Sequence, residues 1–305
     1  MSLPQTYSSL PLKEVRVSNH PANAAGVTPI QIVTLYRPNA HNAFTRVMQE
    51  ELVLLWNTFD ADDRVKVIIM TGHGKMFCAG ADLQQGFKRD LSGKINDHRD
   101  GGGRVAIAIH QCRKPTIGAM QGSAVGVGMT MTLPMAIRVA YKGGKYGFPF
   151  ARRGLVMEAA SSFFLPKLIG NGRTMHLIST GATYPGDHKL FDGMFTEVMD
   201  TPDAVLMRAI ELASEIVDNC STVAWALMRD LVWRPTPSAE EQHLLDSRIL
   251  YSMFSGAENN EGVKAFLEKR KVNFTGSLPK DAPEVYPWWP LIDTRDPVKD
   301  AKAKL

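Results

Sequence analysis

The sequence predicts an α/β fold with a mostly parallel sheet, followed by a helical C-terminal region. Up to about residue 200, short strands rich in β-branched residues alternate with helical stretches, which is the pattern of βαβ units. From about residue 201 onward, only the helical spacing of apolar residues remains. A chain of 305 residues is also long enough to bury a large core without help from disulfides or metals.

The N-terminal strands and helix are the first elements of this pattern. Residues 12–18 and 29–36 alternate or cluster β-branched side chains and predict a hairpin. An amphipathic helix follows over residues 45–59, with Thr45 in the N-cap position. Residues 65–72, VKVIIMTG, then predict a buried strand that ends in a glycine turn.

The middle of the chain predicts further strands and helices. Residues 84–103 are polar and glycine-rich, which is typical of a surface loop or a broken helix. A helix over 104–112 leads into a strand and turn at 113–122. A helix of small residues and another strand then occupy 123–140, and we expect one more helix over 159–169.

The C-terminal third predicts helices and then an irregular tail. The helical stretches are 203–219, 222–233, 238–255 and 261–271. We therefore expect three parts: a core with the functional site over 1–200, a helical region over 201–275, and an extended tail over 276–305.

Composition argues against several classes of protein. Lys and Arg number 35 against 31 Asp and Glu, and this net charge of +4 is far from the balance of a nucleic-acid-binding protein. Three widely spaced cysteines (Cys78, Cys112 and Cys220) predict free thiols in a reducing compartment. No apolar run reaches about 18 residues, so we expect no membrane span. No histidine pairing has the spacing of metal ligands, so we expect no metal site.

The last three residues, Ala303-Lys304-Leu305, are a near match to the SKL address for peroxisomes, with Ala in place of Ser. The alternative is a frayed lysine-rich terminus, because three-residue matches also arise by chance. We expect import by the peroxisomal receptor that reads this signal, and a cytoplasmic location otherwise.

Two loops rich in glycine and alanine, and one glutamate in apolar surroundings, are the candidate functional features. The loops lack the G-x-G-x-x-G order of a dinucleotide site, and no G-x-x-x-x-G-K-[ST] or G-x-S-x-G motif is present in the sequence. Small residues let a ligand approach the backbone, so that two N–H groups can bind one carbonyl oxygen. Glu158, in GLVMEAASS, can then transfer a proton at the ligand carbon next to that carbonyl, if burial raises the pKa of Glu158.

Simpler interpretations of the same features remain open at this point. A strand that ends in a glycine turn is usually only a turn, and small residues at a helix start usually serve close packing. Glu158 lies near the predicted start of the 159–169 helix, where the helix dipole favours an anion without any catalytic role. We expect burial to outweigh the dipole and to shift the pKa of Glu158 modestly upward.

Taken together, these segments resemble the crotonase (enoyl-CoA hydratase/isomerase) superfamily, from about Val15 to Lys271. RPNAHNAF is similar to the family's RPxxxNAL segment, and VKVIIMTGHGKMFCAGADL to its strand and SAGADL loop, with Cys78 where Ser is common. KPTIGAMQGSAVGVGMTMTLPMAIRVA is similar to KPxIAAVxGxAxGxGxxLxxxxDxxxA, with Ala136 where Asp is usual. The resemblance implies a spiral of ββα and βαβ turns. It also implies a helical C-terminal region that covers the acyl site and builds trimers or hexamers.

By this resemblance, the backbone N–H groups of Ala81 and Val127 form an oxyanion hole for the carbonyl of an acyl-CoA thioester. Coenzyme A is part of that substrate, so no separate cofactor is implied. The family's hydratases use two glutamates, but the aligned positions hold Thr130 and Phe150, neither of which is an acid or base at neutral pH. The family's Δ3,Δ2-enoyl-CoA isomerases carry one glutamate in a GLxxExxSS-like segment, where Glu158 falls.

The resemblance therefore favours an enoyl-CoA isomerase of fatty acid β-oxidation, in which Glu158 takes a proton from C2 and returns it to C4. On this interpretation Glu158 is the only acid–base residue that faces the thioester. Two alternatives remain: a hydratase or dehydratase on a specialised acyl-CoA, in fatty acid or secondary metabolism, and an acyl-CoA-binding subunit without catalysis. The other substrate-binding candidates are Lys75 for the coenzyme A phosphates, Phe87 and Leu91 for the acyl chain, and Ala79, Asp82, Leu83, Gly126 and Phe150.

Overall fold

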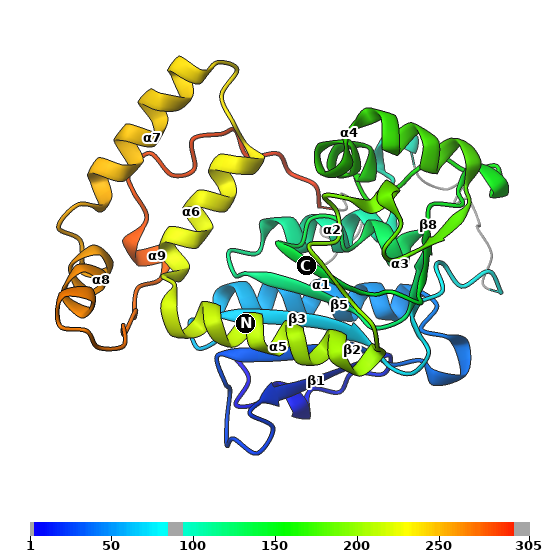
Figure 1. The fold of residues 1–305 in the computed structure, drawn as a ribbon, viewed down its shortest axis with the longest axis horizontal. Coiled ribbons are helices and arrows are strands. Elements are labelled where there is room, and N and C mark those ends of the chain that lie inside the picture. The colour runs from blue at the N-terminus through cyan, green and yellow to red at the C-terminus, as the bar shows by residue number, and fades with distance from the viewer. Residues whose placement is uncertain (1–2, 85–93, 296–305) are drawn as a thin grey trace.

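The computed structural model describes residues 3–84 and 94–295, and its centre is a six-stranded sheet (Figure 1). The strands are β1 (Val15–His20), β2 (Ile30–Leu35), β3 (Val67–Gly72), β5 (Thr116–Met120), β7 (Ile137–Tyr141) and β10 (Glu197–Met199), in the order β1-β2-β3-β5-β7-β10. Strands β1 and β2 pair antiparallel as a hairpin, and every other pair in this sheet is parallel.

A smaller four-stranded sheet lies beside the large one. Its strands are β4 (Met76–Cys78), β6 (Ser123–Val125), β8 (Lys145–Gly147) and β9 (Thr183–Pro185), in the order β4-β6-β8-β9. The chain alternates between the sheets, because β3, β5 and β7 of the large sheet are each followed by β4, β6 and β8 of the small one. Each repeat is one turn of a spiral, so the ends of β4 and β6 lie next to each other.

Helices connect the turns of this spiral. They are α1 (Arg46–Ala61), α2 (Gly101–Gln111), α3 (Val127–Thr130) and α4 (Ser161–Thr180), with short 3₁₀ turns at Tyr7–Ser9, Pro38–Ala40, Ile95–Asp97, Ala151–Arg153 and Lys189–Phe191. Helix α1 begins as the sequence predicts, because the Thr45 side chain accepts a hydrogen bond of 3.1 Å from the Met48 N–H. Its apolar face, which includes Leu52, Leu55 and Phe59, is fully buried.

The large sheet is covered on both faces, which explains why its strands read as continuous apolar runs. In β3, Ile68 and Met70 point into the same core as the buried face of α1. The alternate residues, Val67 and Ile69, pack against helix α5 (Pro202–Asn219) on the opposite face. Helix α5 lies in the 201–275 segment expected to form a separate helical region, but it packs as a layer of the sheet core.

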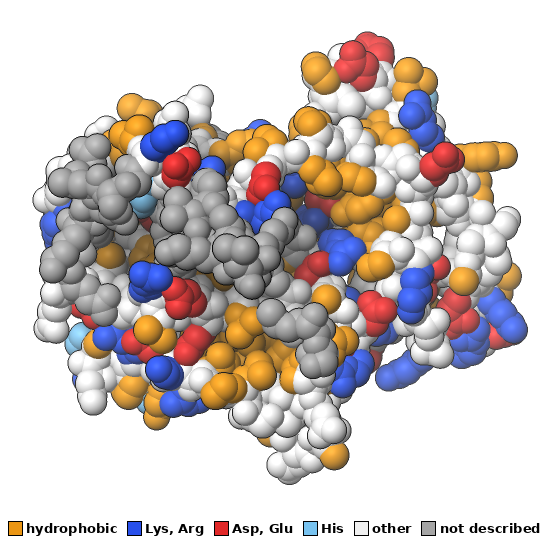
Figure 2. Space-filling model, turned by 180° about the vertical axis from the view of Figure 1, so that it is seen from behind, with side chains coloured by type: hydrophobic (Ala, Val, Ile, Leu, Met, Phe, Trp, Pro, Cys, Tyr) orange, Lys and Arg blue, Asp and Glu red, His pale blue; other side chains and the backbone are white. Residues whose placement is uncertain are grey.

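The remaining helices form a lobe that stands away from the sheets, at the left of Figure 1. This C-terminal lobe consists of α6 (Thr222–Trp233), α7 (Ala239–Met253), α8 (Ala257–Leu267) and α9 (Leu278–Asp281). The predicted irregular tail contains α9 and then packs against α6, where Trp288 Nε1 donates to the Arg234 carbonyl at 3.3 Å. Hydrophobic side chains remain exposed on the lobe, which occupies the right of Figure 2; they include Val232, Leu250, Tyr251 and Phe266.

The α/β spiral with a helical C-terminal region is confirmed, but several elements differ from the prediction. Residues 123–125, expected to begin a helix of small residues, form strand β6 instead, and α3 spans only Val127–Thr130. Helix α2 begins at Gly101 rather than at residue 104, and α4 begins at Ser161 rather than at residue 159. Over residues 3–84 and 94–295, no helix is long and apolar enough to cross a membrane.

Candidate active site

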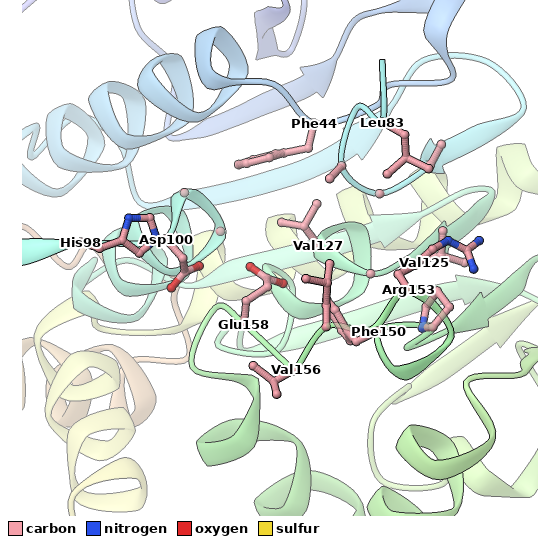
Figure 3. Close-up of a pocket in the computed structure, with 18 residues that line it drawn as sticks. Phe44, Leu83, His98, Asp100, Val125, Val127, Phe150, Arg153, Val156 and Glu158 are labelled. Atoms are coloured by element: carbon pink, nitrogen blue, oxygen red, sulfur yellow. The ribbon is translucent and has the colours of Figure 1, made fainter. Parts of the chain in front are cut away.

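A cavity of about 550 Å³ lies between the ends of β4 and β6, the start of α2, and the segment that leads into α4 (Figure 3). Most of its wall is apolar, and four side chains bring polar groups to it: His98, Asp100, Arg153 and Glu158. The other lining residues are Phe44, Ala79, Gly80, Ala81, Leu83, Gly101, Gly102, Val125, Gly126, Val127, Pro149, Phe150, Leu155 and Val156. A mostly apolar cavity with a few convergent polar groups is typical of a binding site for a small molecule.

The first glycine loop is held in place by the RPNAHNAF segment. The Phe44 N–H donates to the Gly80 carbonyl at 2.8 Å, and the Asp82 N–H donates to the Phe44 carbonyl at 2.9 Å. Gly80 has a φ of +89°, a conformation that glycine adopts without strain. The Ala81 N–H lies between these paired groups and donates to no group in the described part of the chain.

The second loop presents a matching N–H group. Gly126, with a φ of +55°, donates to the Gly147 carbonyl at 3.1 Å and ends strand β6. Val127 is the first residue of α3, so its N–H has no partner within the helix, and none elsewhere among the described residues. A Cβ added to Gly126 would lie 4.0 Å from the Gly80 Cα, which shows how closely the two loops approach. Two unpaired N–H groups on adjacent loops of one cavity can form an oxyanion hole.

Glu158 lies on the wall of the same cavity. The Thr130 hydroxyl, itself fully buried, donates a hydrogen bond to Glu158 Oε1. Burial raises the pKa of Glu158 to about 8; the Asp100 carboxylate adds to this rise and the Thr130 hydroxyl opposes it. The upward direction expected from the sequence agrees with this value, although the shift is larger than modest.

The backbone after Glu158 explains why the helix starts late. Ala159 and Ala160 have φ values of 57° and 52°, in the left-handed region that residues with a Cβ rarely adopt. The Glu158 carbonyl accepts hydrogen bonds from the Ser161 N–H at 3.0 Å and from the Ser161 hydroxyl at 2.6 Å. Glu158 therefore precedes α4 in a strained turn instead of occupying its first helical turn, and such strain is common at functional sites.

A second carboxylate faces the cavity, and the sequence-based interpretation missed it. Asp100 is the N-cap of α2, where its Oδ1 accepts a hydrogen bond of 2.5 Å from the Gly103 N–H. The same Oδ1 accepts one of 3.3 Å from the N–H of Ala159, the neighbour of Glu158. Figure 3 shows the carboxyl groups of Asp100 and Glu158 directed toward each other. The expectation that Glu158 is the only acid–base residue at the site is therefore wrong.

Most of the predicted site residues meet at this cavity. It is lined by Glu158, Ala81, Val127, Ala79, Leu83, Gly126 and Phe150. Asp82 does not line it, because its carboxylate turns to Arg37, with the Arg37 Nη1 3.0 Å from Asp82 Oδ2. Lys75 is exposed beyond the cavity wall. Phe87 and Leu91 lie outside the described residues.

Three polar residues of the cavity were not identified from the sequence. His98 and Asp100 belong to the stretch interpreted as a polar surface loop, and Arg153 to a segment in which only Phe150 was considered. The sequence held one signal for Asp100: it precedes three glycines, and Asp is a preferred N-cap residue, so a helix could have been predicted to begin there. Within the described ranges, no group of three or more His, Cys, Asp and Glu side chains is arranged to hold a metal ion.

Comparison with known proteins agrees with this geometry. The family model described as enoyl-CoA hydratase/isomerase matches residues 26–277. A protein of Alternaria alternata named enoyl-CoA hydratase AFT3-1 is 47% identical over 280 residues, which cover 92% of each chain. The mevalonyl-coenzyme A hydratase SIDH of Beauveria bassiana is 29% identical over 251 residues, covering 79% of this chain and 90% of that protein.

Solved structures show the same fold. A probable enoyl-CoA hydratase/isomerase from Mycobacterium abscessus superposes with a TM-score of 0.75 at 27% identity, covering 81% of this chain and 96% of the other. DspI of Pseudomonas aeruginosa superposes with a TM-score of 0.76 at 26% identity, covering 88% and 99%. With its spiral fold and the two glycine loops at one cavity, the chain belongs to the enoyl-CoA hydratase/isomerase, or crotonase, family.

Proposed function

We propose that this protein is an enoyl-CoA hydratase, which adds water across the C2=C3 bond of a 2-enoyl-CoA and catalyses the reverse dehydration. The observation that supports this most is a carboxyl group with a raised pKa beside two unpaired N–H groups. The N–H groups of Ala81 and Val127 would bind the thioester oxygen, and Glu158 would transfer a proton at C2. Losing one such donor typically costs roughly 10²–10³ in rate, and a positioned acid or base contributes roughly 10²–10⁴.

The names of two relatives favour hydration over isomerisation, because AFT3-1 and SIDH are both named as hydratases. The raised pKa of Glu158 suits either reaction, since a group with a pKa near the working pH can both give and take a proton. In hydration, the protonated carboxyl group supplies the proton at C2 when water attacks C3. In isomerisation, the ionised form removes a proton from C2.

Isomerisation remains the second candidate for one specific reason. By the family resemblance, the two hydratase glutamates align with Thr130 and Phe150, and the structure places Phe150 on the cavity wall as an apolar side chain. A single carboxyl group that moves a proton from C2 to C4 would suffice for isomerisation.

A direct assay separates these two functions. The purified protein is given 2-enoyl-CoA and 3-enoyl-CoA substrates of several chain lengths, and 3-hydroxyacyl-CoA and 2-enoyl-CoA are measured. We expect 3-hydroxyacyl-CoA from the 2-enoyl substrates, and a loss of at least about 10²-fold in Glu158→Gln. Glu240→Gln makes the same change on the exposed start of α7 and should be neutral. If the protein converts only the 3-enoyl substrates, the proposed function becomes isomerisation. Full activity of Glu158→Gln would exclude both proposed functions.

The substrate would bring its own coenzyme A, and the proposed steps require no further cofactor. Arg153 lines the cavity and carries a charge that suits the phosphates of coenzyme A. We expect Arg153→Ala to raise KM for acyl-CoA with a smaller effect on kcat.

We also propose that the protein is a homotrimer or a dimer of trimers. The exposed hydrophobic side chains of the C-terminal lobe, such as Val232 and Phe266, support this because isolated soluble chains rarely leave so many uncovered. Light scattering on the purified protein tests it, and a monomer at micromolar concentration would contradict it.

Peroxisomal import is a separate proposal. It is supported only by the terminal Ala303-Lys304-Leu305, which lies outside the described residues. A fluorescent protein that carries the last dozen residues should enter peroxisomes, and removal of Leu305 should leave it diffuse.

A further inference from the structure

We propose that Asp100 is the second catalytic residue of the hydration, the base that takes a proton from the attacking water while Glu158 delivers one to C2. This proposal rests on the hydratase function proposed above. It concerns a residue on α2, whereas the family resemblance places the second glutamate at Phe150, which has no titratable group.

The two oxygens of the Asp100 carboxylate have different environments. Oδ1 accepts both backbone hydrogen bonds, from the Gly103 N–H and the Ala159 N–H, and so holds the start of α2 against the turn that carries Glu158. Oδ2 accepts no hydrogen bond from a backbone N–H among the described residues, and the Asp100 carboxyl group also hydrogen-bonds to the carboxyl group of Glu158. Oδ1 therefore has a structural role, and we assign the proton from water to Oδ2, the oxygen that takes part in no backbone hydrogen bond.

The glycines at the start of α2 leave room for this pair of carboxylates. A Cβ added to Gly102 would lie 1.8 Å from Glu158 Oε2, and one added to Gly103 would lie 2.4 Å from Asp100 Oδ2. Side chains at either position would occupy the space of a carboxylate oxygen. Glycine is a poor helix former, at a cost of about 1 kcal/mol relative to Ala, so two glycines here are better explained by the site than by the helix.

The proximity of the two carboxyl groups is also visible in their electrostatics. The Asp100 carboxylate helps to raise the pKa of Glu158, which keeps the Glu158 carboxyl group protonated as a donor. Two neighbouring carboxyl groups of which one is protonated and one ionised form a complementary acid and base.

The reaction balances with this pair. Asp100 Oδ2 removes a proton from water as the water oxygen bonds to C3. The electron pair of C2=C3 moves to form the enolate, whose oxygen the N–H groups of Ala81 and Val127 bind. The enolate then takes the proton of Glu158 at C2. Asp100 is left protonated and Glu158 ionised, and one proton passed from Asp100 to Glu158 restores the starting state.

Asp100→Asn tests the proposal because it separates the two oxygens. The amide oxygen of Asn can still accept both backbone hydrogen bonds, and Asn is as good an N-cap as Asp. The amide nitrogen in place of Oδ2 cannot accept a proton. Asp97→Asn is the matched control, because it makes the same change three residues earlier at a side chain that does not line the cavity.

Two reactions are measured on each purified variant. One is hydration of crotonyl-CoA and trans-2-decenoyl-CoA, and the other is exchange of the C2 protons of butyryl-CoA and decanoyl-CoA in D₂O. Exchange requires Glu158 and the oxyanion hole but no attack by water. We expect Asp100→Asn to lower hydration by roughly 10²–10⁴ while exchange continues and the melting temperature stays near that of the wild type. Glu158→Gln should lose both reactions.

The remaining outcomes distinguish the two proposals. Hydration by Asp100→Asn at the wild-type rate would overturn the role of Asp100 and leave the hydratase function intact. Equal loss of hydration and exchange in a folded Asp100→Asn would show that Asp100 only positions Glu158, which also overturns the proposal. Exchange without hydration in the wild type would refute the hydratase function itself, and the role of Asp100 with it.

Discussion

Adding one methyl group at Gly102 should disable the site without harming the fold. A Cβ on Gly102 would lie 1.8 Å from Glu158 Oε2, 2.9 Å from Glu158 Cδ and 3.0 Å from Val127 Cγ2. Ordinary contacts of this kind begin at about 3.4 Å, so the carboxylate has to move by about 1.5 Å. A misplacement of 1 Å can cost about 10²-fold in rate, and we expect a fall in kcat of at least that size for Gly102→Ala.

The free energy of unfolding of Gly102→Ala should be equal to that of the wild type or higher. Ala is a better helix former than Gly by about 1 kcal/mol, and Gly102 lies within α2. Gly172→Ala is the matched control, because Gly172 lies in α4 and an added Cβ there meets nothing within 4 Å. The assays are kcat with a 2-enoyl-CoA and the melting temperature of each variant. A Gly102→Ala enzyme with wild-type kcat would show that Glu158 does not act from its position next to Gly102.

Two further predictions concern the pKa of Glu158. Because the folded-state pKa is about 8 against an ordinary 4.5, the wild type loses stability as pH rises from about 5 to 8, whereas Glu158→Gln does not. At about 1.4 kcal/mol per pKa unit, the stability of the variant relative to the wild type should rise by about 5 kcal/mol between pH 4 and pH 9 in urea unfolding; a constant difference would contradict the raised pKa. Thr130→Val removes the hydrogen bond that opposes the shift, so its hydration rate should fall at a higher pH than the wild-type rate does. An unchanged pH profile would mean that Thr130 does not act on Glu158.

The fold was predictable because its signals are local. The full burial of β3 appears as an apolar run, and the Thr45 cap appears as a Thr before an amphipathic stretch. The two loops rich in glycine were predictable for a similar reason, since Gly80 and Gly126 have positive φ angles in the structure, whereas the proposed oxyanion roles of Ala81 and Val127 came from the family resemblance. Each of these features depends on residues that are close in sequence.

The pairing of Asp100 with Glu158 had no such local signal. The two residues are far apart in the sequence, and they meet because the start of α2 and the turn before α4 close on the same cavity. The left-handed conformations of Ala159 and Ala160 were equally hidden, because alanine itself favours a helix there. Tertiary contacts hold that turn, so the sequence predicts a helix start that comes two residues too early.

The position of a carboxyl group in space, and not of a glutamate in the sequence, determines what this site can do. Thr130 and Phe150 stand at the two positions that align with the hydratase glutamates. The alignment alone therefore leaves Glu158 as the single residue that can carry a proton. The structure shows that the Thr130 hydroxyl donates a hydrogen bond to the carboxyl group of Glu158, so an acid lies next to a residue that aligns with a hydratase glutamate. Asp100 then brings a second carboxylate from a different helix. Two carboxyl groups on the wall of one cavity meet the needs of the proposed water addition, so the absence of the two aligned glutamates no longer favours isomerisation over hydration.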